Sequence, residues 1–142
     1  MAETLQTLVD KAEIADVVHT YALNIRNRSP ELNAGLFTEN GSFEVRDADP
    51  MVPSSLTTRS RGDGLEEVIK SASSSSASGR VFPAIHNLLV TLNGETASAT
   101  SLMIATFFPG GRELLGEYED HLVREDGVWK FTSRCYTIYR EG

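Results

Sequence analysis

The sequence predicts an α+β domain in which helices cover one face of a mostly antiparallel sheet. Between Ile14 and Ile25, apolar residues recur at i, i+3, i+4 and i+7, the spacing of one helix face. From Val81 onwards the pattern changes to a period of two residues, and Asn93-Gly94 and Asp126-Gly127 are turn signals between the runs. Helices followed by hairpin-connected strands are typical of α+β domains.

Three helices are expected before the sheet. The apolar stripe predicts a first helix over residues 4 to 28. Ser29 as N-cap and Pro30 at the first helical position predict a short second helix that ends near Phe37. A third helix is expected to start at Asp63 and to run through GDGLEEVIKSAS.

The strands are predicted from alternation and from turn residues. TENG is expected to be a turn that leads into a short strand, SFEVR. Residues 47–61 contain two prolines and many small polar residues, so most of this segment is expected to be a loop that ends in a short strand before Gly62. The low-complexity run SASSSSASG is also expected to be a loop. Four longer strands then follow, at about 82–93, 96–109, 112–125 and 128–140.

Length, charge and composition exclude several classes of protein. A chain of 142 residues is expected to be a single domain, 1–142, with a core of its own. A formal charge of −7 with scattered basic residues argues against nucleic-acid binding. Cys135 is the only cysteine, and the spacing of His and acidic residues matches no metal motif, so no disulfide, metal or cofactor is expected. The N-terminal sequence resembles neither a signal peptide nor a membrane span, so a cytoplasmic protein is expected.

Alternation within the strands assigns polar side chains to the two faces of the sheet. In 113–123, the set that contains Glu113, Glu117 and Glu119 is predicted to face solvent. Asp120 is therefore predicted to point inward with Tyr118, while the adjacent His121 points away. The alternative for Asp120 is a structural carboxylate that bonds to a neighbouring strand or to Arg134.

The same reasoning predicts two more inward polar groups. His86 shares a face with Leu88, and Tyr21 lies within the apolar stripe of the first helix. In the last strand, Trp129, Phe131 and Cys135 are predicted to point inward and Arg134 outward. A core histidine and a packed tyrosine are the structural alternatives. Together, Tyr21, His86 and Asp120 predict a polar group within a cavity between helix and sheet.

Several segments resemble one known family. They are EIADVVHTYA in the first helix, LFTENGSFEV, GDGLEEVI, IHNLLVTLNGETASATS and the closing GEYEDHLVREDGVWKFTSR. Over nearly its whole length the chain resembles the SnoaL-like polyketide-cyclase branch of the nuclear-transport-factor-two-like superfamily. The resemblance implies a cone-shaped barrel, with three helices packed on a strongly curved, mostly antiparallel sheet that encloses a hydrophobic pocket. Members of the superfamily include cyclases, dehydratases, isomerases, epoxide hydrolases and non-catalytic modules, so the fold alone does not give a function.

The resemblance implies catalytic roles for His86, Asp120 and Tyr21. His86 falls near a catalytic histidine of dehydratase-like members, but the aspartate that those members place on the first helix is replaced here by Arg26. Asp120 and Tyr21 match an acidic position and a helical tyrosine of the isomerases. Glu44, Asp47 and Asp49 remain alternatives for a catalytic base. The expected substrate pocket is lined by Arg26, Asn24, Phe43, Glu44, Met103, Phe107 and Tyr118.

These residues favour a cofactor-independent enzyme of small-molecule or secondary metabolism. We expect proton transfer on a hydrophobic, carbonyl-bearing substrate, by cyclisation, isomerisation or dehydration, with Asp120 and His86 as acid and base and Tyr21 as a donor to the oxyanion. The alternatives are epoxide hydrolysis in the same pocket, or a non-catalytic ligand-binding or dimerisation module. A homodimer is expected, because Leu115, Val123 and Ile138 are predicted on the outer face of the sheet.

Overall fold

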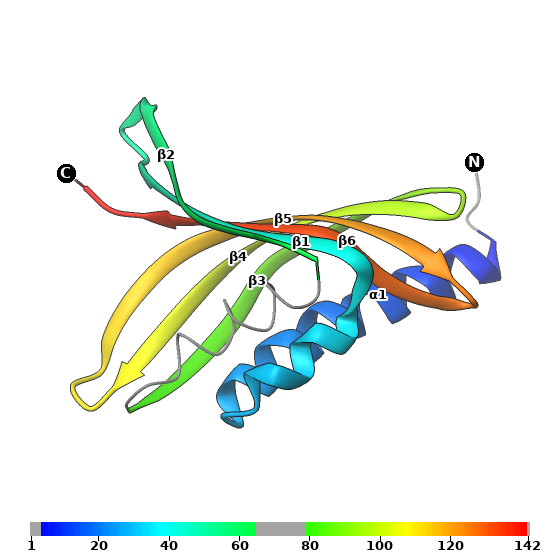
Figure 1. The fold of residues 1–142 in the computed structure, drawn as a ribbon, viewed down its shortest axis with the longest axis horizontal. Coiled ribbons are helices and arrows are strands. Elements are labelled where there is room, and N and C mark those ends of the chain that lie inside the picture. The colour runs from blue at the N-terminus through cyan, green and yellow to red at the C-terminus, as the bar shows by residue number, and fades with distance from the viewer. Residues whose placement is uncertain (1–3, 65–78, 142) are drawn as a thin grey trace.

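The computed structural model describes residues 4–64 and 79–141, which form two helices and a six-stranded sheet (Figure 1). The strands are ordered β2-β1-β6-β5-β4-β3 in the sheet. β1 and β6 are parallel, and the other neighbouring pairs are antiparallel. In chain order the elements are α1 (Leu5–Arg26), the 3₁₀ helix η1 (Pro30–Leu36), β1 (Phe37–Asp49), β2 (Val52–Asp63), β3 (Arg80–Asn93), β4 (Thr96–Phe108), β5 (Arg112–Glu125) and β6 (Val128–Tyr139).

The first helix and the four long strands match the predicted ranges closely. Thr4 caps α1, because its hydroxyl accepts a hydrogen bond from the backbone N–H of Thr7 at 3.2 Å. The second helix is present as η1 and starts at Pro30 as expected, although Ser29 makes no side-chain cap. The predicted third helix falls almost entirely on residues outside the described ranges, and Asp63, its expected cap, is the last residue of β2.

Most of residues 47–61 form strands, so the prediction of a loop there is wrong. β1 extends to Asp49, and after a turn β2 pairs with it in antiparallel register from Val52. Nearly all of β2 is exposed, because it is an edge strand, so it lacks the apolar alternation that predicts buried strands. β1 also starts earlier than predicted, at Phe37. The residues of the expected TENG turn therefore lie within β1, where its register with β6 is irregular between Phe37 and Ser42.

The sheet bends over α1 but remains open, with β2 and β3 as its edges within the described part of the chain (Figure 1). The strongly curved cone that the resemblance implied is therefore corrected to a bent, mixed sheet. α1 lies against β3 and β6 on one face. Only that face is covered by the described helices.

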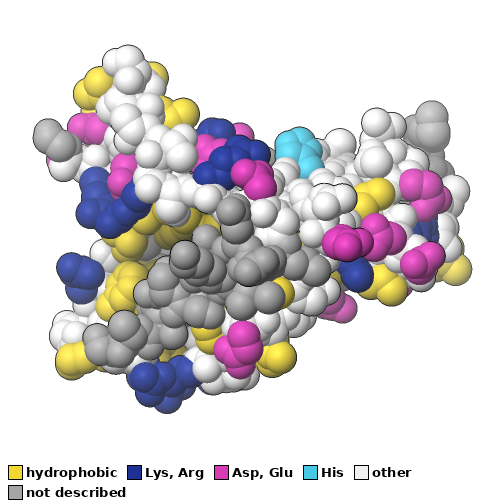
Figure 2. Space-filling view, in the orientation of Figure 1, with side chains coloured by type: hydrophobic (Ala, Val, Ile, Leu, Met, Phe, Trp, Pro, Cys, Tyr) yellow, Lys and Arg dark blue, Asp and Glu magenta, His cyan; other side chains and the backbone are white. Residues whose placement is uncertain are grey.

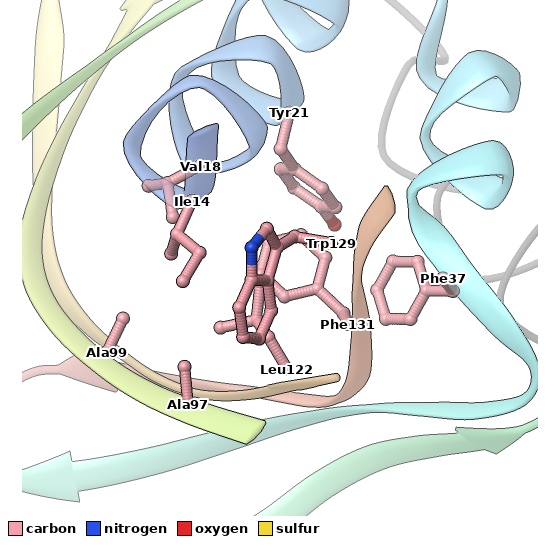
Figure 3. Packing of buried hydrophobic residues seen from close by; sticks show 9 residues of the cluster. All are labelled: Ile14, Val18, Tyr21, Phe37, Ala97, Ala99, Leu122, Trp129 and Phe131. Atoms are coloured by element: carbon pink, nitrogen blue, oxygen red, sulfur yellow. The ribbon is translucent and has the colours of Figure 1, made fainter. Parts of the chain in front are cut away.

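A closed hydrophobic core fills the space beneath the first half of α1 (Figure 3). Ile14 and Val18 point from the helix toward Phe131 and Trp129 on β6, and Leu122 on β5 completes the contact. Each of these side chains is at least 98% buried. Complete burial of one such side chain contributes about 1.5–3 kcal/mol to folding, so this contact fixes the helix on the sheet.

A polar cluster closes the same end of the domain. Asp10 of α1 is buried and accepts hydrogen bonds from the Trp129 indole Nε1 at 3.2 Å and from Arg124 Nη1 at 3.1 Å. Gln6 Nε2 donates a third bond at 3.0 Å, and Arg124 also pairs with Glu95. The Asp10 carboxylate is thereby fully satisfied, and it ties the start of α1 to the β5–β6 hairpin.

Candidate functional site

A cavity of about 530 Å³ lies between the second half of α1 and the sheet. Its wall is mainly apolar and comes from α1 and from all six strands. This volume is typical of sites for small molecules. The lining residues are Tyr21, Ile25, Phe43, Val45, Arg59, Ser60, Val81, Pro83, Met103, Ala105, Phe107, Leu114, Tyr118, Tyr136 and Ile138.

Three tyrosines give the cavity its polar character. The rings of Tyr21 and Tyr118 meet edge to face with centroids 6.1 Å apart, and those of Tyr118 and Tyr136 are 4.8 Å apart. Burial raises the pKa of all three phenols well above the ordinary value, so each remains protonated near neutral pH. Each phenol therefore keeps its proton and can donate a hydrogen bond.

Tyr136 carries an unsatisfied hydroxyl. Its Oη is buried and has no hydrogen-bond partner among the described residues. The ring occupies the space that a side chain at Gly116 would fill, since a Cβ there would overlap its Cε1, Cζ and Oη atoms. Gly116 thus allows Tyr136 to pack flat on β5, and its unpaired hydroxyl is buried against that strand.

A buried ion pair lies behind the tyrosines. Nε of Arg134 donates to Oδ1 of Asp120 at 2.9 Å, and both side chains are inaccessible to solvent. The guanidinium carbon lies 3.5 Å from the ring centroid of Tyr118 and 4.3 Å from that of Tyr21, and Nη1 has no acceptor within the described part of the chain. Burial raises the pKa of Asp120, and the charge of Arg134 offsets part of this effect.

Asp120 points inward, as alternation predicted. It is paired with Arg134, which was the alternative to a catalytic role for this carboxylate. Neither residue lines the cavity, and the Arg134 guanidinium is separated from it by the rings of Tyr118 and Tyr21 that it contacts. The outward assignment of Arg134 is wrong because β6 contains a bulge. Phe131 pairs with Leu122 and Ser133 with His121, so Thr132 is an extra residue that reverses the alternation.

The same bulge changes the rest of β6. After Thr132, Arg134, Tyr136 and Ile138 point inward, while Cys135 faces the other side with Glu44. The inward assignment of Cys135 is therefore wrong. Ile138 lines the cavity instead of the outer face where a partner was expected to bind.

The inward placement of His86 is also wrong. The register of β3 on β4 shifts between His86 and Leu89, and Asn87 adopts a positive φ of 53°. Ile85 packs against the core before this bulge and Leu88 after it, so His86 is left exposed. The structure thus separates His86 from Asp120 and Tyr21.

Three other predicted pocket residues lie outside the cavity wall. Glu44 alternates between Phe43 and Val45, which line the cavity, so it points to the opposite face and binds Arg46, Thr58 and Arg61. Arg26 is exposed with its guanidinium over the Phe82 ring. The Asn24 amide donates to Asn33 Oδ1 at 2.9 Å.

The structure places Phe43, Met103, Phe107, Tyr118 and Tyr21 on the cavity wall. Of the alternative bases, Asp47 follows Val45 on the same face of β1 but does not line the cavity. Asp49 accepts a hydrogen bond from Met51 N in the hairpin turn. Sequence reasoning missed Arg59 of the wall and named Arg134 only as an alternative partner of Asp120, because the inward position of each depends on a bulge.

Neither a metal site nor a membrane span is found in the part of the chain that the structure describes. No three His, Cys, Asp or Glu side chains come together there as metal ligands. No helix in residues 4–64 or 79–141 is long and apolar enough to cross a bilayer.

Residues 6–135 match the model of the SnoaL-like domain family. The chain belongs to this family. No curated protein matches its sequence significantly. Because the match covers most of the chain, the family assignment extends to the helix, the sheet and the cavity between them.

Solved structures share the fold at low sequence identity. Rv3472 of Mycobacterium tuberculosis, a protein of unknown function, is 24% identical with a TM-score of 0.79, over 95% of this chain and 75% of that one. A candidate scytalone dehydratase from Novosphingobium aromaticivorans is 22% identical with a TM-score of 0.75 (94% and 87% covered). An NTF2-like protein with a cystatin-like fold from the same organism is 17% identical with a TM-score of 0.76 (94% and 84% covered). These likenesses establish an NTF2-like fold and do not extend to an activity.

Proposed function

We propose that the SnoaL-like cavity binds a small, mainly apolar molecule that carries an oxygen acceptor. The observation that supports this most directly is the buried hydroxyl of Tyr136, a residue of the cavity wall, which has no partner among the described residues. An unsatisfied buried donor costs about 1–3 kcal/mol, and an acceptor on a ligand would recover part of that cost. Tyr21 and Tyr118 offer two further phenols in the same space.

Binding is favoured over acid–base catalysis by the groups that line the cavity. Among the described lining residues, the only titratable side chains are the three tyrosines and Arg59. No described imidazole or carboxylate faces the cavity, since His86 is exposed and Asp120 is held by Arg134. A general base near neutral pKa, which such chemistry ordinarily uses, is therefore missing from the described wall.

A proton-transfer enzyme is the second candidate, acting on a carbonyl-bearing substrate by cyclisation, isomerisation or dehydration as in polyketide cyclases. It is favoured by the contact of the Arg134 guanidinium with the rings of Tyr21 and Tyr118. The positive charge opposes the effect of burial on the pKa of Tyr21 and would stabilise an oxyanion bonded to that phenol. The epoxide-hydrolase alternative needs paired acids at the cavity, which the described wall lacks.

The binding proposal is tested with hydrophobic ketones and the substitution Tyr136→Phe. We expect at least one ketone to bind, as measured by calorimetry, and Tyr136→Phe to weaken its binding about five- to ten-fold, the value of one hydrogen bond. Tyr139→Phe is the matched control, because the Tyr139 hydroxyl bonds to Glu117 outside the cavity. Equal weakening in both variants, or in neither, would contradict the assigned role of Tyr136.

Turnover of a bound ketone separates the two candidates. A binding protein leaves the ketone unchanged, whereas an enzyme exchanges its α-protons with D₂O, a reaction that NMR detects. Exchange that is lost in Tyr21→Phe and retained in Tyr139→Phe would favour the enzyme over the binding protein.

The expected homodimer remains a proposal. Leu115 is 43% exposed on β5, and Val123 follows on the same side of that strand. Light scattering of the wild type and of Leu115→Glu tests whether this side is the interface.

A further inference from the structure

Three arginines lie on or beside the cavity wall. Arg59 lines the wall, and its side chain is 49% exposed. The guanidinium of Arg112 lies 5.5 Å from the ring centroid of Phe107, another wall residue. Arg140 lies close to Arg59, since both approach the same carboxylate oxygen of Asp47. In Figure 2, Lys and Arg side chains flank a hollow in which hydrophobic side chains are exposed.

Two of these arginines share one carboxylate. Asp47 Oδ1 lies 3.6 Å from Nη1 of Arg59 and 3.7 Å from Nε of Arg140, and it makes no hydrogen bond with any described residue. Arg112 has no ion pair with a described carboxylate, and its guanidinium lies over the Phe107 ring. The guanidinium groups of Arg59 and Arg140 thus approach a carboxylate oxygen that neither of them hydrogen-bonds.

A bulge in β2 directs one of these arginines to the cavity. Val45 pairs with Ser60 and Arg46 pairs with Thr58, so Arg59 is the extra residue between them. Bulges of this kind redirect a side chain next to binding sites. The result is an exposed cation on the wall of an otherwise apolar cavity, and low-dielectric walls strengthen the field of such charges.

We infer that the ligand is a hydrophobic carboxylate, whose apolar body fills the cavity and whose negative charge lies at the entrance among Arg59, Arg112 and Arg140. This inference rests on the proposed binding function and names the chemical class of the ligand. Arginine suits this role because its planar guanidinium bonds carboxylate oxygens in pairs. Tyr136, whose hydroxyl has no hydrogen-bond partner among the described residues, lines the same cavity.

The test uses two probes of nearly equal shape, 2-naphthoate and 2-acetonaphthone, of which only the first is charged. We expect naphthoate to bind about tenfold more tightly in calorimetry at low salt, and this advantage to shrink at about 0.3 M salt, where exposed charges are screened. Arg59→Gln, Arg112→Gln and Arg140→Gln should each weaken naphthoate binding about two- to five-fold and leave acetonaphthone unchanged. Lys130→Gln is the control, because it removes one positive charge from a residue that does not line the cavity.

The outcomes separate the two proposals. If both probes bind equally and the arginine variants match Lys130→Gln, the inference of an anionic ligand is overturned while the binding function stands. If neither probe binds the wild-type protein, the proposed binding function itself fails. Selective loss of naphthoate binding in the arginine variants supports both.

Discussion

The two ends of the interior contain similar residues but differ in whether their buried polar groups have hydrogen-bond partners. At one end, Asp10 bonds to Trp129, Arg124 and Gln6, and the apolar side chains beside it are closely packed. At the other, the hydroxyl of Tyr136 and Nη1 of Arg134 are buried without partners, beside a cavity of about 530 Å³. The first arrangement suits stability, whereas the second leaves space and hydrogen-bonding capacity for a ligand.

The largest expected effect comes from breaking the ion pair at the cavity end. Arg134→Met leaves the Asp120 carboxylate buried without its partner, so we expect a loss of about 3–5 kcal/mol in the free energy of unfolding, measured with urea. The double variant with Asp120→Leu should lose less, because no buried charge remains. Arg124→Met at the closed end should cost less than Arg134→Met, since Asp10 keeps two other donors. An equal loss of unfolding free energy in Arg134→Met and Arg124→Met would contradict the expected difference between the two ends.

Leucine truncation compares the packing of the two ends. Leu122→Ala in the closed core should cost about 2–5 kcal/mol of unfolding free energy, because the site cannot collapse around the missing atoms. Leu114→Ala on the cavity wall should cost about 1 kcal/mol, since that side chain already borders empty space. Urea denaturation of both variants checks this. A similar loss for the two would indicate that the cavity is filled in solution.

The two buried aspartates are expected to give the smallest effects, with opposite pH dependence. Burial alone would raise the pKa of Asp10, but hydrogen bonds from Trp129 and Gln6 and the charge of Arg124 hold it below the ordinary value. Its contribution to stability is therefore lost as the pH falls through that lowered pKa. The pKa of Asp120 is raised by burial, so its contribution is complete at acidic pH and is lost as the pH rises through the raised pKa.

Thermal unfolding between about pH 3 and pH 7 tests the signs. Asp10→Asn should lessen the fall of stability on acidification relative to wild type. Asp120→Asn should remove the opposing component, so that its stability falls more steeply than wild type on acidification. Slopes that change in the same direction in both variants would contradict the assignment.

The sequence was sufficient to predict the main elements but insufficient to assign every face of the sheet. The apolar stripe of α1, the period-two alternation and the turn signals predicted one helix and four strands, and alternation placed Asp120 inward correctly. His86 and Arg134 were assigned to the wrong faces because one extra residue in a strand reverses every side chain that follows it. Such a bulge depends on pairing with the neighbouring strand, which local sequence does not encode.

The cavity was predictable in outline, whereas its polar groups were not. Phe43, Met103, Phe107 and Tyr118 followed from apolar alternation and the family resemblance. Arg59 was missed because β2 is an exposed edge strand, where the selection for alternating apolar residues is absent. The unsatisfied state of Tyr136 depends on Gly116 of another strand, so no reading of β6 alone could have found it.

The parallel pairing of β1 with β6 also has a consequence for the order in which the domain folds. β6 lies between β1 and β5, so it alone joins the β1–β2 hairpin to the β3–β5 meander within the described sheet. During synthesis these two parts emerge first and can each form local pairs, but neither can be joined to the other until β6 has left the ribosome. Pairing of such distant segments pays a large loop-closure entropy and slows folding. The nascent chain therefore passes through a stage in which the interior between the two parts of the sheet is still open to solvent.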